Sequence, residues 1–277
     1  MIAALIITFR EVLEAALIIG VVLAATRGIP KARYWVAVGI LGGVTGAVIV
    51  AQFAGAISDS VSGFGQEIFN ASVLLLAVLM LAWHNVWMST HGKQMAAEMR
   101  NVGDEVRAGG RPLYALAIVV GLAVMREGSE IVLFLYGLAA ADGGLTNAVT
   151  GGAAGLAIGI VVGAALYFGL LRIPSRYLFQ VTAWLIAFLA AGMAAQAMVF
   201  LSAADLVKLG PQLWDSSSLL SQNNIPGQIL HTLIGYVDRP RALQGVAYLG
   251  TLALIFGAMH FMSRRHRHTT TAASARH

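Results

Sequence analysis

The chain has no cysteine, and only 11% of its 277 residues carry a charge. Without cysteine, disulfide bonds and thiolate metal sites are excluded. The low charge, set against 58% hydrophobic residues and a mean hydropathy of +0.77, excludes a single water-soluble core, because too few charged side chains are present to cover the apolar sequence. The composition therefore predicts an all-α polytopic membrane protein.

The apolar N-terminus also lacks the basic start and the small-residue cleavage site of a signal peptide, so we expect it to be retained as a membrane span. Seven apolar segments are long enough to cross a bilayer. They lie at about 1–25, 34–57, 67–89, 113–141, 146–171, 177–204 and 241–262. An odd number of spans places the two termini on opposite sides.

The distribution of basic residues predicts the orientation, because Lys and Arg collect in cytoplasmic loops. Alternate connections and the C-terminal tail hold thirteen of them, against three on the other side. The N-terminus is therefore expected outside and the C-terminus in the cytoplasm. The formal charge of +5 thus follows membrane topology and does not indicate a nucleic-acid partner. The thirteen are Arg27, Lys31, Arg33, Lys93, Arg100, Arg107, Arg111, Arg172, Arg176, Arg264, Arg265, Arg267 and Arg276.

Two segments of the same form, REVLE at 10–14 and REGSE at 126–130, place charges near the middle of the first and fourth spans. A charge at that depth costs roughly 2.5 to 3.5 kcal/mol on insertion scales. Residues at i and i+3 share a helix face, so each motif presents two carboxylates in one direction. An Arg four residues before the second Glu allows a structural ion pair, but the duplication favours a functional site. We predict that Glu11, Glu14, Glu127 and Glu130 bind a metal, with Arg10 and Arg126 balancing their charge.

The chain also repeats itself. A glycine-rich stretch at 42–46 matches one at 151–155, 109 residues on, and the charged motifs are 116 residues apart. A repeat of three spans enters the membrane the opposite way the second time, which predicts inverted repeats with the site at their interface. We expect a first repeat at 1–90, a cytoplasmic connection with a short helix at 91–112, a second repeat at 113–204, an outer loop at 205–240, a seventh helix at 241–262 and a basic tail at 263–277.

Carboxylates without sulfur or imidazole suit a hard cation, and they do not separate iron from manganese, magnesium or calcium. Binding is expected to weaken as the pH falls, because the ligands must be deprotonated. His84, toward the inner end of the third span, is either an accessory residue that passes an ion onward or a hydrogen-bonded histidine between helices. Asn70 is most simply a contact between helices.

The two charged motifs in the first and fourth of seven spans resemble the oxidase-dependent iron permease family, which includes fungal ferric permeases and bacterial Efe-type permeases. Further likenesses are QEIF at 66–69, LAAGM at 189–193 and LIGY at 233–236. The resemblance implies a cell-membrane permease, in a bacterium at the inner membrane, that is not an enzyme and holds no cofactor. It also implies that Glu11, Glu14, Glu127 and Glu130 bind ferric iron in transit.

In that family a separate ferroxidase or peroxidase oxidises the iron, so such a partner is implied here. Family members often carry a Glu after the Phe of the third span, where this chain has Asn70; Glu67 and Asn70 are therefore possible accessory residues beside His84. Two alternatives stay open. One is a permease for another metal such as manganese or lead, and the other is a membrane di-iron oxidase, although neither motif has the Glu-x-x-His spacing of such sites.

Overall fold

The computed structural model describes residues 1–61, 66–141, 144–169, 175–222 and 224–274. These residues form eight α-helices and no strand. The helices are α1 (Ile2–Ala25), α2 (Ala32–Val61), α3 (Gln66–Arg107), α4 (Tyr114–Ala141), α5 (Leu145–Tyr167), α6 (Ser175–Ala203), α7 (Ile225–Ile234) and α8 (Ala242–Ser274).

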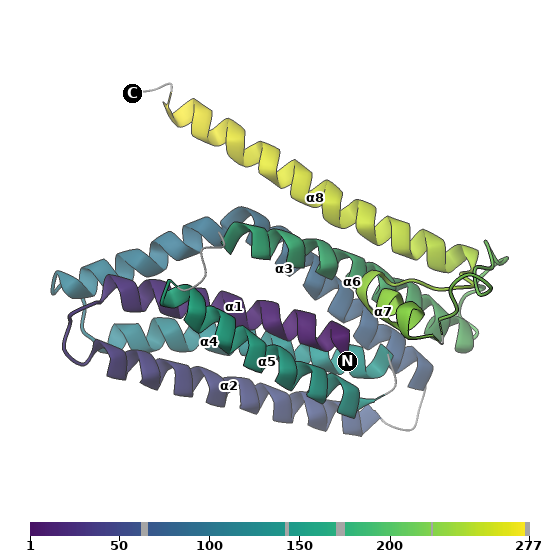
Figure 1. The fold of residues 1–277 in the computed structure, drawn as a ribbon, viewed down its shortest axis with the longest axis horizontal. Coiled ribbons are helices and arrows are strands. Elements are labelled where there is room, and N and C mark those ends of the chain that lie inside the picture. Colours follow the sequence, from purple (N-terminus) through teal and green to yellow (C-terminus); the bar gives the residue numbers. More distant parts are fainter. Residues whose placement is uncertain (62–65, 142–143, 170–174, 223, 275–277) are drawn as a thin grey trace.

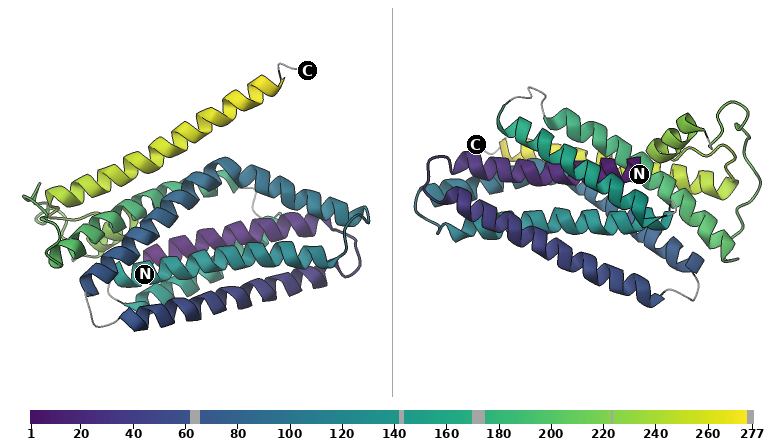
Figure 2. Two further views of the ribbon diagram at one scale, coloured as in Figure 1. Left: turned by 180° about the vertical axis from the view of Figure 1, so that it is seen from behind. Right: turned by 60° about the horizontal axis from the view of Figure 1, so that its bottom comes forward.

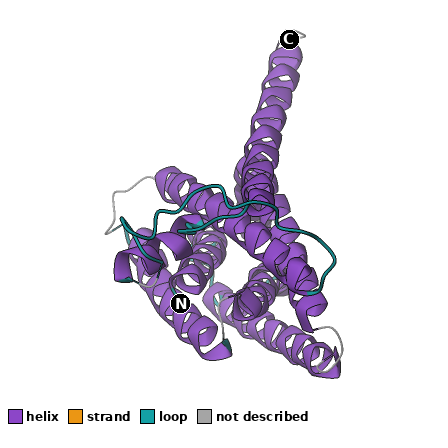
Figure 3. Cartoon of the chain, turned by 90° about the vertical axis from the view of Figure 1, so that its right-hand side faces the viewer, coloured by secondary structure: helices purple, strands orange, loops and turns teal. Residues whose placement is uncertain are grey.

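The long helices alternate in direction, so that α1 and α4 run antiparallel (Figure 1). Short α7 and the segments around it lie at the end of the bundle that also holds the N-terminus (Figure 1). Helix α8 packs on α6 and α3 over its N-terminal half, where Ile255 is buried, and its C-terminal part stands away from the bundle (Figure 3). The molecule is thus a bundle of α1 to α6 with α8 attached along one side.

Five of the described helices are long and apolar enough to cross a membrane: α2, α3, α5, α6 and α8, within the stretches Ala32–Phe53, Glu67–Met88, Leu145–Tyr167, Gln180–Ala203 and Ala242–Met262. Helices α1 and α4 have similar lengths, and each contains one charged motif.

Helix α3 differs from the expected layout. The segment 91–112 was predicted to be a separate connection with its own short helix, but α3 continues without a break to Arg107. The two halves of α3 lie at an angle to each other (Figure 2). As a result, Val106 near its C-terminal end packs with Val22 of α1 and Leu116 of α4.

Close helix crossings are built on glycine. In α2, Gly39 and Gly43 face the backbone of α4, because a Cβ at either position would lie 2.6 Å from a carbonyl oxygen, that of Ala117 or of Gly121. Only a residue without a side chain allows the two backbones to approach this closely. The α2–α4 pair is accordingly one of the most extensive helix contacts in the bundle.

The α1–α5 pair has the same construction. Gly151 and Gly155 of α5 face the carbonyl oxygens of Met1, which directly precedes α1, and of Leu5 in α1. These two oxygens lie 116 positions before those of the α2–α4 crossing, which is also the interval between the charged motifs. The corresponding glycines are 112 positions apart, three more than the interval of 109 predicted from the sequence.

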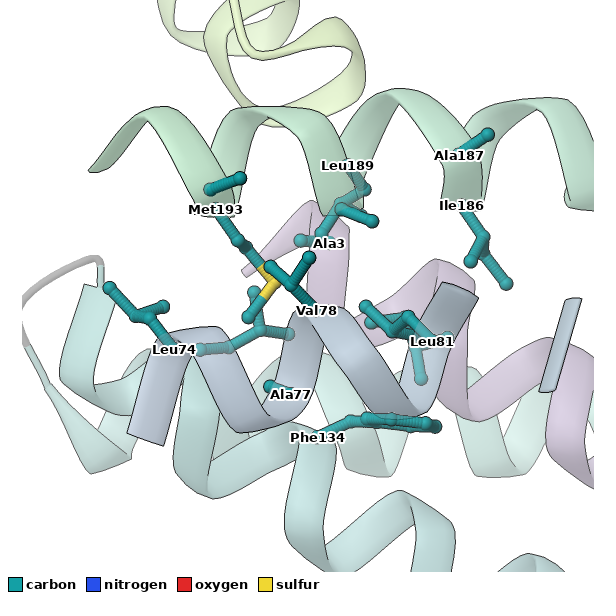
Figure 4. Packing of buried hydrophobic residues seen from close by; sticks show 14 of the residues in the cluster. Ala3, Leu74, Ala77, Val78, Leu81, Phe134, Ile186, Ala187, Leu189 and Met193 are labelled. Atoms are coloured by element: carbon teal, nitrogen blue, oxygen red, sulfur yellow. The ribbon is translucent and has the colours of Figure 1, made fainter. Parts of the chain in front are cut away.

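Two apolar cores lie at different depths of the bundle. The first joins α1, α3, α4 and α6, with Leu74, Leu81, Phe134, Ile186 and Met193 among its members (Figure 4). The second lies toward the end of the bundle that is formed by the α1–α2 turn and the C-terminal end of α3. It contains Val22, Val36, Val106, Leu116 and Val120. The charged motifs of α1 and α4 lie in sequence between the residues that α1 and α4 give to these cores.

Candidate functional site

The charged residues of α1 and α4 meet one histidine of α3 between the two apolar cores. One ligand atom from each of Glu11, His84, Glu127 and Glu130 lies within 4.8 Å of the others. Glu11, Glu127 and His84 are 0%, 2% and 3% exposed. Three helices that are distant in sequence therefore supply a compact group of metal-ligating side chains, buried halfway along the bundle.

The imidazole of His84 is central to this group. Its Nε2 lies 3.6 Å from Glu11 Oε2 and 3.4 Å from Glu14 Oε2, and its Nδ1 contacts Glu130 Oε2. The next residue helps to set the rotation of α3, because the Asn85 side-chain amide donates a 2.9 Å hydrogen bond to the Ala183 carbonyl oxygen in α6. His84 thus links the glutamates of both motifs.

Glu14 lies beside this group and is paired with Arg10. The Arg10 Nε lies 3.0 Å from Glu14 Oε1, and its Nη1 lies 3.7 Å from Glu11 Oε1. The Arg10 side chain is only 3% exposed, so this is an ion pair enclosed by protein. The first motif therefore contains its own counter-charge.

The second motif is arranged differently. Arg126 is 37% exposed, donates a 3.1 Å hydrogen bond from Nε to Glu130 Oε1, and places its guanidinium 4.4 Å from the centroid of the Trp87 ring. The contact with an aromatic face stabilises the cation. The two arginines, equivalent in sequence, thus occupy a closed and an open environment.

Two residues considered as accessory ligands lie elsewhere. Glu67 is exposed at the start of α3, and Asn70 lies one turn further on. Both are about 20 to 25 Å from His84 along the helix axis, at 1.5 Å per residue. They do not belong to the group of ligands around His84.

The chain is also similar to known proteins over nearly its whole length. The model of the iron permease FTR1 family matches residues 1–268. The chain belongs to this family. Its membership, together with its several apolar helices, makes it a multi-pass membrane protein of iron transport.

The chain is also similar to individual proteins that are named as iron permeases. The chain is 30% identical over 239 residues to proteins called ferrous iron permease EfeU from Escherichia coli O6:K15:H31 and from Shigella sonnei, with 84% of this chain and 86% of the relative covered. It is also 30% identical over 247 residues to the EfeU of Yersinia pestis, with 87% of each chain covered. No solved structure matches the chain.

The electrostatics of this group of side chains favour a cation. The four glutamates and two arginines give a formal charge of −2 when His84 is neutral. Both carboxylate oxygens of Glu11 and one of Glu127 are buried without a hydrogen-bond partner. A buried carboxylate oxygen that accepts no hydrogen bond is costly, and a cation at this place would lower that cost.

Proposed function

We propose that the chain is an iron permease that carries iron across the membrane through the group formed by Glu11, Glu127, Glu130 and His84. The observation that supports this most strongly is the meeting of these side chains from α1, α3 and α4 at one buried place. Glu14 extends the group through its contact with His84. Arg10 and Arg126 then balance the carboxylates when no ion is bound.

The proposal includes the membrane arrangement. Seven helices, α1 to α6 and α8, cross the bilayer, with the N-terminus outside and the C-terminus in the cytoplasm. Helices α1 to α3 and α4 to α6 form two inverted repeats. Support comes from the exchange of partners, since the first helix of each half packs against the second helix of the other half through equivalent glycine contacts. Rocking one repeat against the other provides alternating access to the site.

The donor set bears on the ion. An imidazole among carboxylates suits a divalent transition metal such as Fe²⁺ better than Mg²⁺ or Ca²⁺. Fe²⁺ also balances the formal charge of −2, whereas Fe³⁺ would leave a positive charge in a buried place. We therefore propose Fe²⁺ as the ion bound in transit, in agreement with the name of the EfeU relatives. The ferric ion, with a ferroxidase or peroxidase partner, is the alternative that the family resemblance implies.

The open environment of Arg126 suggests the release route. Arg126 and Trp87 lie toward the second apolar core, on the side that we expect to face the cytoplasm. Arg10, by contrast, is enclosed. We propose that the ion leaves past Arg126, whose bond to Glu130 replaces the departing ion.

The test is uptake of radioactive iron by the full chain reconstituted into vesicles, with ascorbate to keep the iron ferrous or with citrate and ferric iron. Glu127→Gln preserves the size of the side chain and removes its charge, and we expect uptake to fall at least tenfold. Glu98→Gln, on the exposed surface of α3, is the matched control and should retain uptake. Wild-type uptake by Glu127→Gln would refute the proposed site, and uptake of ferric iron alone would refute the choice of ion.

A further inference from the structure

A second polar feature lies at the end of the bundle away from α7, at the turn between α1 and α2. A pocket of about 300 Å³ opens there, and three cationic residues line it: Arg27 and Lys31 from the turn and Arg33 from the first turn of α2. Tyr167, from the end of α5, lines it as well. None of the three cations forms an ion pair with a carboxylate of the described residues, so the pocket carries uncompensated positive charge.

The turn that carries these cations is held in place. Arg107, at the end of α3, donates a 3.0 Å hydrogen bond to the Arg27 carbonyl oxygen. Gly28 has φ of 89°, and Lys31 has φ of 64°, in the left-handed region that residues with a side chain seldom adopt. These conformations let the chain reverse between Ala25 and Ala32, and they keep three like charges around one hollow.

The surroundings of the pocket indicate the boundary between lipid and water. Tyr34 and Trp35 pack edge to face at the start of α2, and Tyr167 and Phe168 do so at the end of α5. Aromatic side chains gather at this level of a membrane, beside the headgroups. The pocket also has an apolar part, formed by Leu23 and Ile29.

We propose that this pocket binds the phosphate group of an anionic phospholipid, with Arg27, Lys31 and Arg33 around the phosphate and Leu23 and Ile29 beside the start of the acyl chains. Basic pockets between membrane helices on the cytoplasmic side suit such headgroups. The chemistry recognised is a phosphate group with no cation of its own beside it, as in phosphatidylglycerol and unlike the zwitterionic headgroup of phosphatidylcholine. The aromatic surroundings and the apolar part favour a lipid over free phosphate as its source. The proposal does not depend on the transported ion.

The test is native mass spectrometry of the purified full chain in detergent, titrated with phosphatidylglycerol or with phosphatidylcholine. The wild-type protein is expected to bind phosphatidylglycerol more tightly. Arg27→Gln with Arg33→Gln should weaken that binding about thirtyfold, because each basic residue near a membrane surface strengthens the binding of an anionic lipid about fivefold. Lys31→Asn, which keeps a residue tolerant of the left-handed region, should weaken it about fivefold and serves if the double variant does not fold.

The matched control removes two charges from the same end of the molecule, outside the pocket: Arg100→Gln with Arg111→Gln. This variant should stay within about threefold of the wild type. Equal weakening by control and pocket variants, or equal binding of the two lipids by the wild type, would overturn the proposal. Displacement of bound phosphatidylglycerol by 10 mM inorganic phosphate, which we do not expect, would assign the pocket to free phosphate and overturn the lipid.

Discussion

The two motif arginines offer a matched comparison, because they occupy the same place in the two charged motifs and differ in their surroundings. Arg10 is enclosed and lies 3.0 Å from Glu14. Arg126 is 37% exposed and is shared between Glu130 and the face of Trp87. The change to Gln at either position removes one positive charge and keeps a hydrogen-bonding side chain of moderate length.

The structure predicts unequal costs. Removing one partner of a buried ion pair costs about 3 to 5 kcal/mol, because the other charge stays buried without compensation. A half-exposed pair contributes at most about 1 kcal/mol, and an exposed contact between a cation and an aromatic ring adds a similar amount. Arg10→Gln should therefore lower the free energy of unfolding by about 3 to 5 kcal/mol, and Arg126→Gln by less than about 2 kcal/mol.

The assay is thermal unfolding of both variants and the wild type, in one detergent and with a chelator to remove metal. At about 2 to 4 °C per kcal/mol for a chain of this size, Arg10→Gln should lower the melting temperature by roughly 6 °C or more. Arg126→Gln should lower it by clearly less. Equal shifts, or a larger shift for Arg126→Gln, would refute the argument that burial separates the two arginines.

Three further predictions use other contacts. Gly43→Ala should lower the free energy of unfolding by about 1 to 3 kcal/mol, because the new Cβ meets the backbone of α4. Gly42→Ala, with no neighbour within 4 Å of the new Cβ, should leave it unchanged. Equal costs would contradict the close crossing of α2 and α4. A double-mutant cycle of Trp87→Leu with Arg126→Gln should give a coupling energy of about 0.5 to 1 kcal/mol, and zero coupling would dismiss the contact. Adding Fe²⁺ at 100 times its dissociation constant should stabilise the wild type by about 2.7 kcal/mol and Glu127→Gln far less, measured as a shift in melting temperature.

Sequence patterns could predict those parts of the fold that depend on one helix at a time. The spacing of Glu11 and Glu14 places both on one face of α1 whatever α1 packs against. The membership of the iron permease family predicted from the motifs is confirmed. The metal-binding role of the glutamates stays a prediction.

The contacts of His84 depend on how α3 is rotated against α1 and α4. The sequence pattern of α3 alone does not determine that rotation. One signal was present, because His84 and Asn85 are adjacent polar residues in an otherwise apolar stretch, and both are buried. The sequence match between the glycine-rich stretches 42–46 and 151–155 gave an interval of 109 residues, but the glycines that make equivalent contacts are 112 residues apart. The reason is related. Because glycine is frequent in membrane helices, the sequences of the two helices can be aligned in several registers equally well. Only the backbone contacts show which glycines are equivalent.

The exchange of partners between the two halves has a consequence for biosynthesis. In the proposed membrane arrangement, α1 would enter the bilayer before α5, against which it packs, has been translated. Until then its charged residues would face lipid or the translocation machinery alone. The pairing of Arg10 with Glu14 lies within α1 itself, so it is available as soon as that helix forms. The first half of the chain would therefore carry its own neutralising contact through insertion. The proposed iron site would be completed only when α4, in the second half, has been inserted.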